Sequence, residues 1–133
     1  MSTSDYRRLV DAALEVSRRA YAPYSRFSVG AAIAATTGEI FTGTNVENVS
    51  YGLTICAERA AVFSAVAAGV QAFSALAIAS PGGVSPCGAC RQVLAEFCDD
   101  LTIYLVDAKA DADAGIECVG LADLMPRPFS NRG

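Results

Sequence analysis

Short apolar runs of strand length alternate along this chain with segments of helical spacing, and this alternation limits the fold more than any other feature. The runs 27–35 and 40–46 flank turn-prone residues and predict a β-hairpin. Helices are predicted at 4–20, 56–68 and 88–97, strands at 74–79 and 101–106, a loop at 108–115 and a last helical turn at 120–125. The order strand, helix, strand, helix, strand implies parallel pairing with right-handed crossovers, so we expect a mixed sheet covered by helices.

The length of 133 residues, without repeats or a linker, predicts a single domain over 1–133. Hydrophobic residues make up 53% of the chain. This share is enough to fill a core and to leave further apolar side chains on the surface. The Ala-rich helix at 56–68 is expected to be buried on most of its faces. Burial against other copies of the chain is the natural use of the surplus, so we expect an oligomer.

The charge balance argues against polyanionic partners. Ten Lys and Arg against fourteen Asp and Glu give a net charge of −4, with no basic tract, so nucleic acids and acidic membranes are disfavoured. The N-terminus lacks the apolar core of a signal peptide, and no apolar run has the length of a membrane span. A cytoplasmic protein with reduced thiols is expected.

The chain has no His, which excludes Ser-His and Cys-His catalysis and imidazole metal ligands. Its cysteines have ligand-like spacing instead, with Cys56 opening one predicted helix and Cys87 and Cys90 opening the next. Helix N-termini favour thiolates, and three sulfur ligands suit Zn²⁺ with a fourth position open for water.

Two other interpretations of these cysteines stay open at this point. Cys87 and Cys90 alone could form a redox pair, or Cys98 or Cys118 could close a structural zinc site. Glu58 favours the catalytic interpretation, because a carboxylate over the same helix end can move a proton between water and a substrate.

The segments Cys56-Ala57-Glu58 and Pro86-Cys87-Gly88-Ala89-Cys90 resemble the motifs of the zinc-dependent cytidine deaminases, of the small homotetrameric type with three Cys ligands. The similarity extends from Tyr21 to Phe129 and includes Asn45-Val46-Glu47. It implies an α/β fold, a three-layer α-β-α sandwich with a mixed five-stranded sheet.

The resemblance also implies a mechanism. Cys56, Cys87 and Cys90 would hold one Zn²⁺ per chain, and a zinc-bound hydroxide would attack C4 of cytidine or 2′-deoxycytidine. Glu58 would shuttle protons, and ammonia and uridine or 2′-deoxyuridine would leave, as in pyrimidine salvage. Arg59 would donate to ligand sulfurs and offset their charge.

Asn45 and Glu47 lie two apart on a predicted strand, so their side chains share a face. By resemblance this pair binds the ribose 3′-hydroxyl, Phe27 packs on the pyrimidine, and the backbone of Ala57 bonds the pyrimidine edge. Phe129 is similar to an aromatic residue that reaches a neighbouring subunit's site, which places active sites near subunit interfaces of a homotetramer.

Two rival functions remain. A blasticidin S-type deaminase shares the cysteine motifs but lacks the context of Phe27 and of Asn45-Val46-Glu47. A non-catalytic structural zinc or thiol-switch module would instead need a closed site with four protein ligands.

Overall fold

The structure is a computed structural model that describes residues 3–110 and 115–130. Within these residues, five strands form one mixed sheet in the order β2-β1-β3-β4-β5. The strands are β1 (Gly30–Ala35), β2 (Ile40–Thr44), β3 (Phe73–Ser80), β4 (Thr102–Asp107) and β5 (Ile116–Gly120). Strands β3 and β4 pair in parallel, and each other neighbouring pair is antiparallel.

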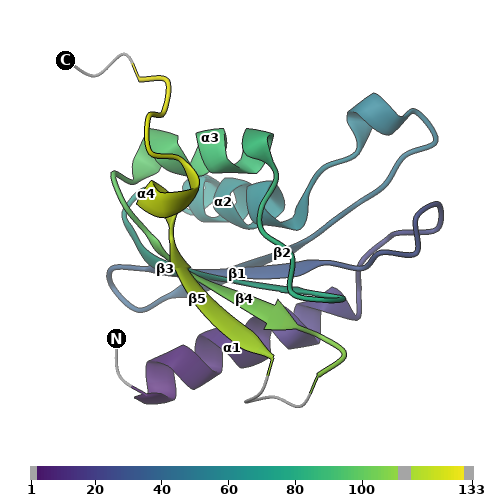
Figure 1. The fold of residues 1–133 in the computed structure, drawn as a ribbon, viewed down its shortest axis with the longest axis horizontal. Helices are drawn as coiled ribbons and strands as arrows, with labels where there is room; N and C mark the ends of the chain where they lie inside the picture. The colour runs from purple at the N-terminus through teal and green to yellow at the C-terminus, as the bar shows by residue number, and fades with distance from the viewer. Residues whose placement is uncertain (1–2, 111–114, 131–133) are drawn as a thin grey trace.

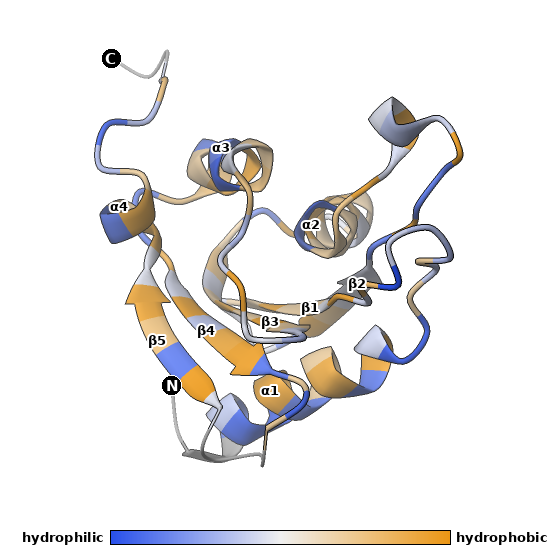
Figure 2. Cartoon of the chain, turned by 45° about the vertical axis from the view of Figure 1, so that its right-hand side comes forward, coloured by the Kyte–Doolittle hydropathy of each residue, from blue (hydrophilic) through white to orange (hydrophobic). Residues whose placement is uncertain are grey.

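Helices cover both faces of the sheet (Figure 1). Helix α1 (Thr3–Ser17) lies on one face, whereas α2 (Ala57–Ala67), α3 (Gly88–Phe97) and α4 (Leu121–Leu124) lie on the other. The hydrophobic strands lie between these two helical layers (Figure 2), and a separate apolar cluster fills each side. The three-layer α-β-α sandwich with a mixed five-stranded sheet is therefore confirmed. None of the helices within the described ranges is long and apolar enough to cross a membrane.

The position of β1 differs from the expected pairing. The alternation of strands and helices predicts that β2 and β3 pair in parallel, but β1 lies between them and is antiparallel to both. The physical reason is burial, because every residue of β1 is buried whereas β2 is only partly covered and forms an edge. An apolar strand without polar positions stabilises the fold most when it has a neighbour on each side.

Several element boundaries also shift from their predicted places. Helix α1 ends at Ser17 rather than at residue 20, and a tighter turn follows in which Arg19 N donates to Val16 O (2.9 Å). The predicted strand 27–35 becomes regular only at Gly30. Most positions of α2 are buried or half-buried, as predicted, and its exposed positions are Phe63 (51% exposed), Ser64 and Ala67.

Strand β5 was not predicted from the sequence pattern. It has only five residues, and its side chains, two exposed and three half-buried, give no strand periodicity. It forms because its backbone pairs with β4, from Thr102 opposite Gly120 to Val106 opposite Ile116. Residues 111–114 of the predicted loop 108–115 lie outside the described residues. The predicted last helical turn is α4, which follows β5 directly.

Helix α2 lies directly on the backbone of β2 at Gly43. A Cβ atom built at Gly43 would lie 2.7 Å from Ala60 Cβ and 2.8 Å from Ala57 O. These distances are below any normal contact, so only a residue without a side chain lets the first turn of α2 approach this closely. The start of α2 carries the predicted zinc ligand Cys56, so this contact also sets the depth of the site.

Gly43→Ala should therefore destabilise the protein. We expect a loss of about 1–3 kcal/mol in the free energy of unfolding, because the added methyl overpacks the α2–β2 contact. Denaturant unfolding of the zinc-loaded protein measures it. Gly52→Ala is the matched control, since a Cβ there meets nothing within 4 Å. Equal losses at the two positions would contradict this account of the packing.

Candidate active site

The three predicted sulfur ligands come together at the N-termini of α2 and α3. Cys56 is the N-cap of α2, Cys87 is the N-cap of α3, and Cys90 lies in the first turn of α3. The Sγ atoms of Cys56 and Cys87 are 3.9 Å apart, those of Cys87 and Cys90 are 3.4 Å apart, and all three lie within 4.8 Å of one another. This is the donor set of a soft divalent cation such as Zn²⁺.

The topology explains why two helix starts meet here. Helix α2 returns the chain from the end of β2 to the start of β3, which runs in the same direction as β2, so α2 begins near the carboxyl end of β3. Helix α3 follows the carboxyl end of β3 directly along the chain. Both N-termini therefore lie at one end of β3, and their positive dipole ends favour thiolates there.

The thiol pKa values reflect this crowding. A hydrogen bond from Cys90, helped by Arg59 and Cys87, lowers the pKa of Cys56 to about 5. The same hydrogen bond and burial raise the pKa of the Cys90 thiol. A divalent cation bound here would need all three sulfurs as thiolates, because metal ligands must be deprotonated.

Arg59, in the first turn of α2, supports the sulfur cluster. Its Nη2 donates to Cys56 Sγ at 3.3 Å, and this hydrogen bond raises the pKa of the guanidinium. Its buried Nε has no hydrogen-bond partner within the described residues. A donor buried beside sulfur ligands fits a site whose full negative charge develops only when the metal binds.

Glu58 is buried beside the sulfur cluster, with 5% of its surface exposed. It lies in the first turn of α2, and burial raises the pKa of its carboxyl group, with the charge of Cys56 adding to the shift. A carboxyl group that takes up a proton more readily than usual is suited to proton transfer.

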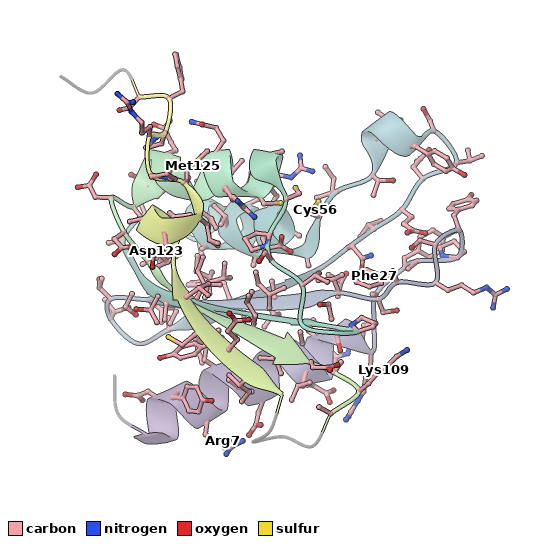
Figure 3. The ribbon with its side chains drawn as sticks, in the orientation of Figure 1. Arg7, Phe27, Cys56, Lys109, Asp123 and Met125 are labelled. Atoms are coloured by element: carbon pink, nitrogen blue, oxygen red, sulfur yellow. The ribbon has the colours of Figure 1, made fainter. Side chains whose placement is uncertain are left out.

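A cavity of about 410 Å³ opens over this cluster. The predicted residues that line it are Phe27, Asn45, Glu47, Cys56, Ala57, Glu58 and Cys87. Phe27 and Cys56 come from the loop before β1 and from the start of α2 (Figure 3). The cavity has the size of a small-molecule site. A smaller cavity of about 220 Å³, beside Asp5 and Arg8 of α1, includes none of these residues.

Asn45 and Glu47 follow the end of β2 and hold the loop that precedes β1. Asn45 Oδ1 accepts from Val29 N (2.9 Å), and Asn45 Nδ2 donates to Phe27 O (2.7 Å). Asn45 N also donates to Val29 O (3.2 Å), so side-chain and backbone bonds together hold this loop beyond the first residue of β1. Glu47 accepts hydrogen bonds from Tyr24 N (2.9 Å) and from Ser25. The Ser25 hydroxyl is the main cause of the lowered pKa of Glu47.

Among the predicted substrate-binding residues, Phe129 alone does not line the cavity. Its side chain is 82% exposed, and its carbonyl accepts from Gln92 Nε2 (3.1 Å) on α3. The neighbouring Arg91 donates to Pro86 O (2.8 Å) and to Leu124 O (2.9 Å), and so fastens both the cysteine loop and the end of α4 to α3.

Several lining residues were missed by the sequence analysis. Ser25, Thr54, Val84 and Ser85 face the cavity from loops, where no periodicity marks an inward position. The one available signal was their nearness in sequence to Phe27, Cys56 and Cys87.

Fold and site together define a protein of the α/β class in which three cysteines at two helix N-termini are positioned to bind a metal ion. The family model described as "Cytidine and deoxycytidylate deaminase zinc-binding region" matches residues 3–106. The chain belongs to this zinc-binding family.

Individual proteins of this family are similar to the chain along most of its length. A cytidine deaminase of Sporosarcina psychrophila is 47% identical over 129 residues, which cover 95% of this chain and 92% of the relative. The crystal structure of a cytidine deaminase from Burkholderia pseudomallei is 42% identical, with a TM-score of 0.86, and the match covers 97% of this chain and 100% of that one. A cytidine deaminase structure from Mycobacterium tuberculosis, also 42% identical, has a TM-score of 0.78 and covers 95% and 98%.

Metal analysis of two cysteine variants tests the ligand set. Cys90→Ser should lose most of the zinc, because a buried hydroxyl replaces one of three thiolates. Cys118→Ser should keep about one zinc per chain, since Cys118 is exposed on β5 and is not part of the cluster. Zinc loss in Cys118→Ser would show that the site includes a fourth sulfur.

Proposed function

We propose that this protein catalyses the hydrolytic deamination of cytidine and 2′-deoxycytidine to uridine and 2′-deoxyuridine, with release of ammonia, as a step of pyrimidine salvage. The observation that carries this proposal is that buried Glu58 lines the same cavity as Cys56 and Cys87, two members of the three-cysteine cluster. The chain is also 42–47% identical, over most of its length, to proteins named cytidine deaminase.

Cys56, Cys87 and Cys90 would hold one Zn²⁺. When bound, zinc supplies the Lewis acidity that makes water a nucleophile at neutral pH. Glu58 would accept one proton of the attacking water and pass it to N3 of the pyrimidine, and would then take the proton of the new hydroxyl group at C4 and pass it to the departing amine. The balance is closed, because water and cytidine give uridine and ammonia. Arg59 offsets part of the charge that three thiolates bring.

The remaining lining residues bind and orient the substrate. Phe27 packs on the pyrimidine, the backbone of Ala57 bonds its edge, and Asn45 and Glu47 hold the sugar. The described residues that line the cavity include no Lys or Arg, but they include Glu47 and Glu58. A phosphate group would be repelled by these carboxylates, so the cavity favours free nucleosides over nucleotides.

The structure offers little support for a closed structural zinc site. Within residues 3–110 and 115–130, the cluster contains three sulfurs and no fourth ligand from Cys98 or Cys118. An open fourth position is what a catalytic zinc site requires.

Glu58→Gln tests the mechanism. The amide keeps the size of the side chain but cannot accept a proton, so we expect zinc to stay bound while kcat falls by roughly 10²- to 10⁴-fold. Ammonia release and metal content are measured on the same sample. Glu96→Gln on the exposed side of α3 is the matched control and should keep full activity. Retained activity in Glu58→Gln would refute the role of Glu58.

We also propose that residues 1–133 act as one catalytic domain in a cytoplasmic homotetramer. Reduced thiols suit the cytoplasm. Apolar side chains gather on the segment around the short helix η1 (Tyr51–Leu53), which projects from the body of the molecule in Figure 1. Val49 and Tyr51 are each 76% exposed, and Phe63 on α2 is a further exposed apolar side chain. Phe129, which does not reach its own cavity, is available to a neighbour's site.

Phe63→Glu should weaken the assembly, because a buried interface tolerates an unpaired charge poorly. Light scattering at micromolar concentration should give a smaller particle than the unmodified tetramer. Thr36→Glu, which adds the same charge at the exposed β1–β2 turn, should leave the particle unchanged. A stable monomer of the unmodified protein would overturn the proposal of an oligomer.

A further inference from the structure

Ser25 is hydrogen-bonded to two other residues that line the cavity, Glu47 and Phe27. Its hydroxyl donates to Glu47 Oε2 and accepts a hydrogen bond from Phe27 N at 3.0 Å. One hydroxyl group can do both, because it has one donor hydrogen and two acceptor lone pairs. Ser25 therefore joins the carboxylate at one end of the cavity to the backbone of the aromatic residue that forms its wall.

The backbone of the loop strengthens this link. Ser25 N and Tyr24 N both donate to Glu47 Oε1, at 3.2 and 2.9 Å. Between Ser25 and Phe27 the chain turns back sharply at Arg26, whose φ of 58° lies in the left-handed region. Arg26 N bonds to Ala22 O (2.9 Å), so this turn is closed on itself.

These hydrogen bonds do not use all of the acceptor sites of the Glu47 carboxylate, so it can still accept a hydrogen bond from a ligand. Three donors occupy part of its acceptor capacity, and an ionised carboxylate offers about four lone-pair sites. The Ser25 hydroxyl also lowers the pKa of Glu47, which keeps the carboxylate ionised and able to accept a further hydroxyl. A second cavity of about 360 Å³ adjoins the first at Ser25, Glu47 and Thr54, so the Glu47 carboxylate has open space on both sides. Without its hydrogen bonds this side chain could rotate away from the first cavity.

We propose that Ser25 is a positioning residue for sugar recognition, which holds the Glu47 carboxylate in register with the Phe27 wall. The inference rests on the proposed function, in which Glu47 accepts the 3′-hydroxyl and Phe27 packs on the pyrimidine. Ser25 touches neither zinc nor the reacting atoms, so its effect is on binding of the sugar and not on proton transfer.

The test compares cytidine with 2′,3′-dideoxycytidine, which lacks the hydroxyl that Glu47 would bind. Ser25→Ala should lower kcat/KM for cytidine by about tenfold, the loss expected for a hydrogen bond to a charged group, mainly through KM. The value for 2′,3′-dideoxycytidine should change by less than about threefold. Ser25→Thr keeps the hydroxyl and should restore most of the activity toward cytidine.

Two further variants separate positioning from a general effect on the loop. Ser28→Ala, in the same loop but lining neither cavity, should change neither substrate. In a Glu47→Ala background, Ser25→Ala should have little further effect on cytidine, because the carboxylate it positions is gone. Zinc content and the thermal midpoint of each variant are measured alongside.

Equal losses for both nucleosides, full additivity with Glu47→Ala, or no change in Ser25→Ala would each overturn the inference. These outcomes differ from failure of the proposed function. If Glu58→Gln is inactive on cytidine while Ser25→Ala behaves as the unmodified protein, the deaminase stands and only the role of Ser25 is lost. If Glu58→Gln is fully active, the proposed mechanism itself fails.

Discussion

The site depends on the close contact between the first turn of α2 and the backbone of β2 at Gly43. This contact sets the depth of Cys56 and Glu58, because both lie within one turn of the helix start. Helix α3 reaches the same place from the carboxyl end of β3, and Arg91 keeps its cysteine loop there. A shift of α2 away from the sheet would separate the sulfurs, and a metal tolerates only a few tenths of an ångström of error in its ligand distances.

The second constraint is charge. Three thiols and the carboxyl group of Glu58 are crowded into one partly buried volume, and a chain without His has no neutral nitrogen ligand to reduce the load. The compensation comes from the positive ends of two helices and from Arg59. In the metal-free site the conflict shows as a lowered pKa of Cys56 and a raised pKa of Glu58. A dication relieves it, so the metal and the arrangement of charges support each other.

The part of the cavity proposed to bind the substrate is held by side-chain hydrogen bonds to a loop. Asn45 and Glu47 leave the end of an edge strand and use their side chains to hold the loop before β1. The groups proposed to bind the sugar therefore also shape the wall that packs on the base. This double use explains why the loop keeps a strained residue at Arg26, since backbone strain persists where surrounding bonds hold it in place.

The cysteine cluster and the alternation of helices and strands could be predicted from the sequence. The spacing of Cys56, Glu58, Cys87 and Cys90 around two helix starts is a local property, and helical and strand periodicities are local too, so a linear pattern shows both. Tertiary structure alone decided that β1 separates β2 from β3, that β5 completes the sheet, and that Ser25 bridges Glu47 and Phe27. These features arise from pairing and hydrogen bonds between residues far apart in the chain. Their energy depends on which surfaces are buried together, and no periodicity in a single segment records that.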